Sequence, residues 1–248
     1  MIIVKETIRT IIKDTIAQTN LTTAYRAPLV GVASAFDPRF AELKEIVDPS
    51  HLLPTDLLPD ARSVVAFFLP FSRAVAEINR RHPYVAREWA VAYVETNQLI
   101  RDICANVTSH FGDQGVHVAY EQPTHNFDAE KLVSFWSHKH VARICGLGQF
   151  GLHHMLITKS GCLGRLGSLA LNTPIDHPDP PAPQLCLVRQ GKNCSHCVRS
   201  CPTGALTASG LDRQLCYKRL LEVNDHYGII GLCDVCGKCT TGPCAVID

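Results

Sequence analysis

The stretch GKNCSHCVRSCPTGAL (residues 191–206) carries three closely spaced cysteines and ends their run with Cys-Pro. A second dense run, CDVCGKCTTGPC (residues 233–244), lies near the end of the sequence, and the chain has 12 cysteines in all. Bacterial ferredoxin-type clusters are bound by C-x2-C-x2-C-x3-C-P, in which the fourth cysteine ligates the other cluster. The spacing therefore indicates iron–sulfur binding.

Eight of the 12 cysteines divide into two sets of four, which predicts two 4Fe–4S clusters. Cys194, Cys197 and Cys201 match the last three positions of the motif, but the first position falls on Gly191. We expect Cys186, five residues earlier, to supply the missing ligand through a longer loop. The predicted ligands are Cys186, Cys194, Cys197 and Cys244 for one cluster, and Cys201, Cys233, Cys236 and Cys239 for the other. Cys216 is an alternative that could displace Cys233 or Cys239.

Structural zinc is the competing interpretation of these thiols. Two C-x2-C pairs can form a tetrahedral zinc site. A C-x2-C-x2-C triplet offers more thiols than zinc needs, and Cys-Pro is typical of cluster loops. The pattern favours two adjacent clusters, which would act as a wire for single electrons.

Composition sets the broad class of the protein. The chain has 248 residues, 46% of them hydrophobic, with 24 Lys and Arg against 23 Asp and Glu. The neutral balance does not predict a large phosphate-binding surface. Residues 1–18 place isoleucines at helical spacing with charges between them, so we expect an amphipathic surface helix and no signal peptide. We expect a cytoplasmic protein with no membrane segment, in which so many cysteines bind metal instead of forming disulfides.

The hydrophobic pattern predicts a mixed α and β domain followed by a small cysteine-rich one. We expect strands at 29–35, 63–71, 116–121, 155–158 and 168–171, and helices at 85–110 and 129–145. Five prolines between Pro174 and Pro183 predict a stiff linker. We therefore expect an α+β chain with domains at 1–178 and 179–248, the second stapled by its clusters.

A glycine-rich stretch covers residues 136–171. Gly146, Gly148 and Gly151 formally match GxGxxG. We reject dinucleotide binding, because that motif must follow a strand and open a helix, whereas this one follows a helical pattern and leads into the apolar run HMLIT. The glycines at 161, 164 and 167 would let backbone approach a flat or bulky ligand. The alternative is a set of tight turns at a sheet corner.

Three stretches together resemble the epoxyqueuosine reductase family and its cobalamin-dependent relatives, which include reductive dehalogenases. They are LVGVASA (29–35), HVARICGLGQFGLHHMLIT (140–158) and the cysteine segment with CVRSCPTGAL, LDRQLCYKRL and CDVCGKC. The resemblance implies a nitroreductase-like, cobalamin-binding α/β domain followed by a ferredoxin-type domain. It also implies a reductive reaction in which electrons pass through the clusters to a base-off cobalamin.

The resemblance also implies site residues and partners. An acidic proton donor would be Asp128, and the family's Glu-Arg pair falls on His138 and Lys139. Residues expected to contact the cofactor are Trp136, Ser137, Gly146, Gly148, Phe150, Gly151, Gly161, Gly164 and Arg165. We expect reduced ferredoxin or flavodoxin as the electron donor and a small molecule or a corrinoid as the substrate. A tRNA substrate is not expected, since the chain is neutral and shorter than epoxyqueuosine reductases. The alternative function is an electron carrier that reduces the corrinoid of a partner protein.

Overall fold

A four-stranded antiparallel sheet forms the centre of the fold. The computed structural model describes residues 4–122, 127–174 and 178–248. Within them the sheet has the order β1-β2-β8-β3, made of β1 (Leu29–Ser34), β2 (Ser63–Pro70), β8 (Gly164–Leu171) and β3 (Val118–Ala119). Every residue of β2 is buried. Alternate β2 side chains enter two different hydrophobic clusters, so both faces of the sheet are covered.

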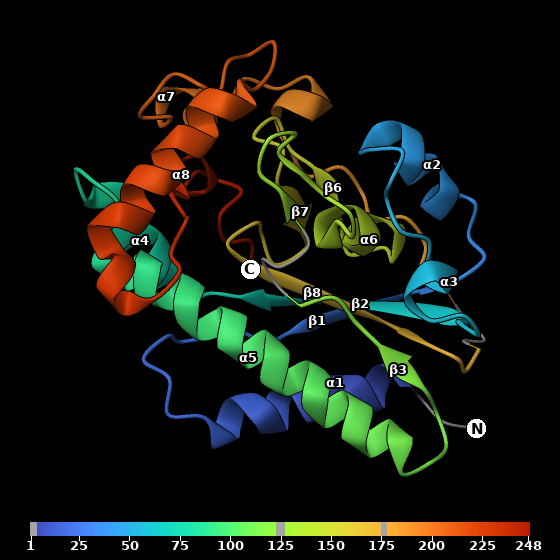
Figure 1. Cartoon of the computed structure of the whole chain (residues 1–248). Helices are drawn as coiled ribbons and strands as arrows, with labels where there is room; N and C mark the ends of the chain where they lie inside the picture. Colours follow the sequence, from blue (N-terminus) through green and yellow to red (C-terminus); the bar gives the residue numbers. More distant parts are fainter. Residues whose placement is uncertain (1–3, 123–126, 175–177) are drawn as a thin grey trace.

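Helices cover the two faces of this sheet (Figure 1). The helices α1 (Val4–Gln18) and α5 (Arg87–Gly112) share one apolar cluster with the first face. The helices α2 (Arg39–Ile46) and α6 (His138–Ile144) pack on the opposite face, near the short α3 (Pro54–Leu57). Ile8 and Ile12 of α1 are fully buried, which agrees with the helical isoleucine spacing in the sequence.

The segment before α6 differs from the expectation of a helix over 129–145. It forms a hairpin of β4 (Phe127–Asp128) and β5 (Val133–Ser134), and α6 begins only at His138. The Asp128 carboxylate accepts the backbone N–H groups of Glu130 and Lys131, and Leu132 has a φ of 55°. This side-chain capping and left-handed backbone close a turn, which competes with helix formation.

A second hairpin follows α6. It consists of β6 (Gly148–Phe150) and β7 (Leu156–Thr158). The GxGxxG match therefore runs into a strand pair instead of opening a helix, so the structure agrees with the rejection of a dinucleotide fingerprint.

The cysteine-rich segment is folded around short helices. These are η1 (Val188–Gln190), α7 (His196–Arg199), α8 (Arg213–Tyr227), η2 (Gly228–Ile230) and η3 (Lys238–Thr240). The helix α4 (Arg73–Arg81) is hydrogen-bonded to the cysteine-rich segment, since Asn79 Nδ2 donates to the Cys236 carbonyl at 3.0 Å.

The end of the chain returns to the sheet. The Cys162 N–H donates to the Cys244 carbonyl at 2.9 Å, and the Leu163 N–H donates to the Ala245 carbonyl at 3.0 Å. The C-terminus accordingly lies beside β8 in Figure 1. The proline-rich linker falls partly at 175–177, outside the described residues, and the domain boundary at 178 stays a prediction. No helix in the described part of the chain is long and apolar enough to cross a membrane.

Candidate metal and cofactor site

A cavity of about 490 Å³ lies between the sheet and the cysteine-rich segment. Aromatic side chains of Trp89 on α5 and Trp136 before α6 line it, together with the charged Lys139 and Arg165. Five thiols also line it: Cys162, and the group of four formed by Cys201, Cys216, Cys236 and Cys239. This end of the cavity has the donor chemistry of a metal or cluster site.

Cys216, not Cys233, completes this group of four thiols. Burial raises the pKa of Cys239, and the neighbouring thiols of Cys236, Cys216 and Cys201 raise it further. Burial and the Asp234 carboxylate raise the pKa of Cys233, and no other cysteine contributes. Cys233 is fully buried in an apolar cluster with Ala90 and Tyr93 on α5. The structure therefore does not bring Cys233 to the other predicted ligands.

The position of Cys216 follows from the start of α8. The Asp212 side chain accepts the Leu215 N–H at 2.9 Å, which caps the helix. Cys216 then lies in the first turns and lines the cavity. No other cysteine lies at motif spacing from Cys216, so the sequence indicated it only as an alternative ligand to Cys233 or Cys239.

The other predicted set surrounds a second cavity, of about 190 Å³. Cys186, Cys194, Cys197 and Cys244, the set expected to hold one cluster, all line it together with Cys239. Gly191 replaces a cysteine in the motif and has a φ of 78° after η1, which brings the chain from Cys186 round to Cys194. Cys239 and His153 line both cavities, so the two sites are adjacent.

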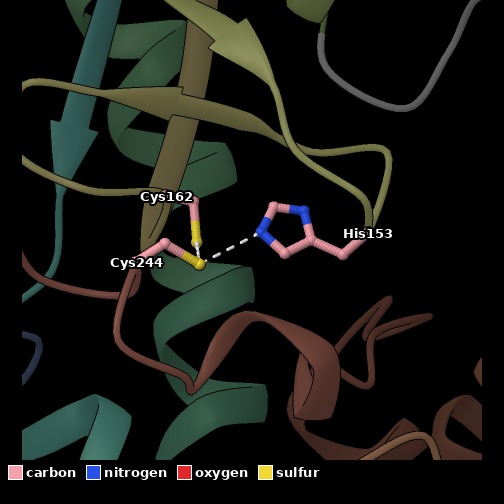
Figure 2. A group of neighbouring side chains, drawn as sticks. All are labelled: His153, Cys162 and Cys244. Atoms are coloured by element: carbon pink, nitrogen blue, oxygen red, sulfur yellow. Dashed lines mark hydrogen bonds between the residues drawn. The ribbon is translucent and has the colours of Figure 1, made fainter. Parts of the chain in front are cut away.

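Two further side chains converge on Cys244, as Figure 2 shows. The Sγ of Cys162 lies 3.9 Å from the Sγ of Cys244, and the Nε2 of His153 lies 3.4 Å from it. Hydrogen bonds from Cys162 and His153 lower the pKa of Cys244. His153 and Cys162 are both buried. Neither residue was among the predicted ligands, because neither lies near another cysteine or histidine at metal-binding spacing.

The segment from Trp136 to Lys139 supplies polar groups to the larger cavity. Trp136 Nε1 donates to the Ser168 hydroxyl at 3.0 Å, and His138 Nδ1 lies 2.7 Å from the same oxygen. Burial, and then the charge of Arg165, lowers the pKa of His138 to about 4. Burial also lowers the pKa of Lys139. Lys139 lies in the first turn of α6, where a cation does not stabilise the helix dipole.

Several residues expected at the cofactor have other positions. Among the described residues around the larger cavity, Asp128, Ser137 and Phe150 do not appear. Asp128 caps the hairpin turn, and the Ser137 hydroxyl lies 2.8 Å from His140 Nδ1. Phe150 packs against the His140 ring, with 4.8 Å between the ring centroids.

Most of the predicted glycines pack against the protein itself. A Cβ at Gly146, Gly148 or Gly161 would collide with a backbone carbonyl oxygen, and a Cβ at Gly151 would collide with the side chain of Ile157. Of the five glycines in the prediction, Gly164 lines the larger cavity. At Gly161, φ is +96° and the obstructing carbonyl belongs to Ala245, so this glycine admits the returning C-terminal segment.

Unpaired buried nitrogens occur in residues that line both cavities. Within the described ranges, three buried side-chain nitrogens lack a hydrogen-bond partner: Trp89 Nε1, His196 Nε2 and Arg219 Nε. Trp89 and Arg219 line the larger cavity, and His196 lines the smaller one. Buried polar groups are normally paired, so three unpaired nitrogens in residues of the cavity walls are unusual.

Comparison with known proteins confirms the resemblance found in the sequence. No protein-family profile matches the chain. It is 33% identical to the epoxyqueuosine reductase of Listeria monocytogenes over 108 residues, which are 39% of this chain and 27% of that protein.

Two solved structures show that the fold is shared. One is an epoxyqueuosine reductase with a tRNA-Tyr epoxyqueuosine-modified tRNA stem loop; it has a TM-score of 0.62 at 20% identity, over 97% of this chain and 65% of that one. The other, a reductive dehalogenase described with a mechanism for B12-dependent dehalogenation, has a TM-score of 0.52 at 14% identity, over 81% and 30%. The chain thus spans less than two thirds of the length of these relatives.

Proposed function

We propose that the protein is a reductase that passes electrons through two 4Fe–4S clusters to a cobalamin in the larger cavity. The observation that carries this proposal is the adjacency of two four-thiol groups, one of which opens into an aromatic-lined cavity. The proposal includes the division into a nitroreductase-like core and a ferredoxin-like segment. The similarity to reductive dehalogenases and epoxyqueuosine reductases supports it.

We assign the cluster ligands by their positions. The first cluster would be held by Cys186, Cys194, Cys197 and Cys244, and the second by Cys201, Cys216, Cys236 and Cys239. Cys216 takes the place given to Cys233 from sequence spacing. In the first set, three cysteines of one segment are completed by the remote Cys244, which is the ferredoxin arrangement. In the second set, Cys236 and Cys239 share one loop, and Cys201 and Cys216 come from two other segments.

The larger cavity has features that fit a corrinoid. It offers apolar walls, and the unpaired Trp89 and Arg219 nitrogens can donate to the amide oxygens that surround a corrin ring. When bound, cobalamin supplies a metal centre that can be reduced by single electrons and can attack an electrophilic substrate. Arg165 is fixed at the wall, since it donates to Asn97 Oδ1 at 2.5 Å and lies 3.9 Å over the Tyr93 ring.

His138 and Lys139 are the residues placed to manage protons in this cavity. The Ser168 hydroxyl accepts from Trp136, so its own proton can be donated to His138 Nδ1. The ring proton of neutral His138 then lies on Nε2, where it can donate to a ligand. Lys139 Nζ lies 3.4 Å from the His154 carbonyl and 5.9 Å from the Phe150 ring centre. Because its pKa is lowered, Lys139 is a better proton donor than a lysine with the usual pKa.

Two classes of substrate are considered for this reductase: a small molecule and a modified tRNA base. A small molecule that reaches the corrinoid in the larger cavity is the substrate class expected from the sequence. One structural neighbour was solved with a tRNA stem loop, so a modified tRNA base is the competing substrate. Substrate-dependent oxidation of the reduced protein, measured with small electrophiles and with modified tRNA in parallel, decides between them.

Titration with cobalamin tests the proposal. The purified protein should shift the visible bands of added cobalamin to the base-off form. Ser134→Trp, which adds bulk to the cavity wall, should weaken binding at least tenfold, while Ser209→Trp on the exposed surface should not. If saturating cobalamin leaves the spectrum unchanged while both clusters are present, the protein is not a cobalamin enzyme and the electron-carrier function takes precedence.

A further inference from the structure

Cys244 differs from the other proposed ligands of the first cluster in its surroundings. Two buried side chains outside the ligand sets, Cys162 and His153, approach its sulfur (Figure 2). Three roles are open to them: ligands of the first cluster, ligands of a separate metal ion shared with Cys244, or hydrogen-bond donors to a cluster ligand. The bonding of each side chain decides among these roles.

The backbone fixes Cys162 beside Cys244. The Cys162 N–H donates to the Cys244 carbonyl, and the next N–H donates to the Ala245 carbonyl. Gly161 permits this close pairing, because any side chain there would strike the Ala245 carbonyl. The approach of the two sulfurs is therefore built into the fold.

His153 is oriented as a donor. The Met155 N–H donates to His153 Nδ1 at 3.1 Å, so Nδ1 acts as the acceptor. A neutral ring then carries its proton on Nε2, the atom that lies 3.4 Å from the Cys244 sulfur. A metal bound at Nε2 would displace that proton, which could not move to the occupied Nδ1. The ring thus favours N–H donation to sulfur over metal ligation.

Cys162 is likewise oriented as a neutral thiol. Its Sγ lies 3.7 Å from the Thr240 carbonyl oxygen and 3.9 Å from the Cys244 sulfur. A thiolate would be repelled by both of these electron-rich atoms, whereas an S–H can donate to either. Cys162 lines the larger cavity, but among the described residues it is not part of the wall of the first-cluster cavity.

We propose that His153 and Cys162 donate hydrogen bonds to the Cys244 sulfur and thereby raise the reduction potential of the first cluster. The inference rests on the proposed cluster function. Reduction adds negative charge that is shared with the ligand sulfurs, so donors to a sulfur stabilise the reduced cluster more than the oxidised one. His153 and Cys162 are then positioning and tuning residues, which act on the cluster through Cys244.

Potentiometric titration of the full-length, anaerobically reconstituted protein tests this inference. The two cluster midpoints are followed by electron paramagnetic resonance in the wild type and in variants. In His153→Leu, one midpoint should shift to a more negative potential and the other should not move. His153→Gln keeps an N–H donor and should restore the shifted midpoint at least in part. Cys162→Ala should shift the same midpoint, with iron content unchanged.

Cys104→Ala is the matched control for Cys162→Ala. Cys104 is an equally buried thiol, but it packs in the apolar cluster between α5 and the sheet. Its replacement should move neither midpoint. Unaltered midpoints in both His153→Leu and Cys162→Ala would overturn the inference, and so would loss of iron from Cys162→Ala, which would make Cys162 a ligand. Failure of the wild type to assemble clusters would instead refute the proposed function.

Discussion

The sharpest test of the ligand assignment is whether Cys216 or Cys233 binds the second cluster. In Cys216→Ala, the proposed second cluster would keep three of its four thiolates. Because each 4Fe–4S cluster holds four irons on four cysteines, iron should fall from about eight to about four per chain. Cys216 is only partly buried, near the start of α8, and alanine favours helix, so any loss of stability should come from the missing cluster and not from the substitution in the helix.

Cys233→Ala is the matched variant, with the opposite expectation. The side chain of Cys233 is fully buried against Ala90 and Tyr93. Its truncation should cost about 1 kcal/mol of stability, the scale for burying one small apolar group, and leave about eight irons in place.

Iron and sulfide analysis after anaerobic reconstitution measures both variants, and thermal unfolding reports their stability. The reasoning is refuted if Cys233→Ala loses half of the iron while Cys216→Ala keeps all of it. That result would restore the ligand set predicted from C-x2-C spacing.

Three further predictions address other parts of the structure. Cys186→Ala should lose the first cluster and keep the second, as seen in iron content; unaltered iron would remove Cys186 from the ligand set. Gly161→Ala should destabilise the protein by about 3 kcal/mol or more in thermal unfolding, because a left-handed backbone and a clash with the Ala245 carbonyl act together. Gly191→Ala, where φ is +78° and no atom obstructs a side chain, should cost only about 1 kcal/mol; equal losses would contradict the clash. His138 has a pKa of about 4 when folded and about 6.5 when unfolded, so the unfolded chain binds more protons between these values. Stability should therefore fall as the pH drops from about 6.5 to 4, by about 1 to 3 kcal/mol, and His138→Gln should flatten this dependence in denaturant titrations; an unchanged slope would show that His138 does not titrate as inferred.

The strands of the fold were predictable because hydrophobic burial determines them directly. The run that follows Ser63 is apolar without interruption to residue 71, and it forms most of β2, which is buried on both faces. The helix expected at 85–110 corresponds to α5. The hairpin at 127–134 was missed, because the capping by Asp128 and the left-handed Leu132 override a pattern that resembles a helix.

The site was predictable where spacing is local. Cys194 and Cys197 share one loop, and Cys186 was inferred from a single gap in the motif. Cys216 and Cys162 reach the site through the capping of α8 and through pairing of the C-terminal segment with the chain before β8. Such tertiary contacts leave no periodic signal in a single sequence. The run of glycines indicated a close approach to the backbone but did not show what approaches it. A ligand and another stretch of backbone both require glycine at such a position.

The metal content of the anaerobically purified and reconstituted protein tests the central claim most directly. About eight irons and eight sulfides per chain are expected, because we assign eight of the 12 cysteines to two four-thiol ligand sets. Zinc bound in place of iron, with little iron retained after reconstitution, would contradict it and show that the same thiols form structural zinc sites.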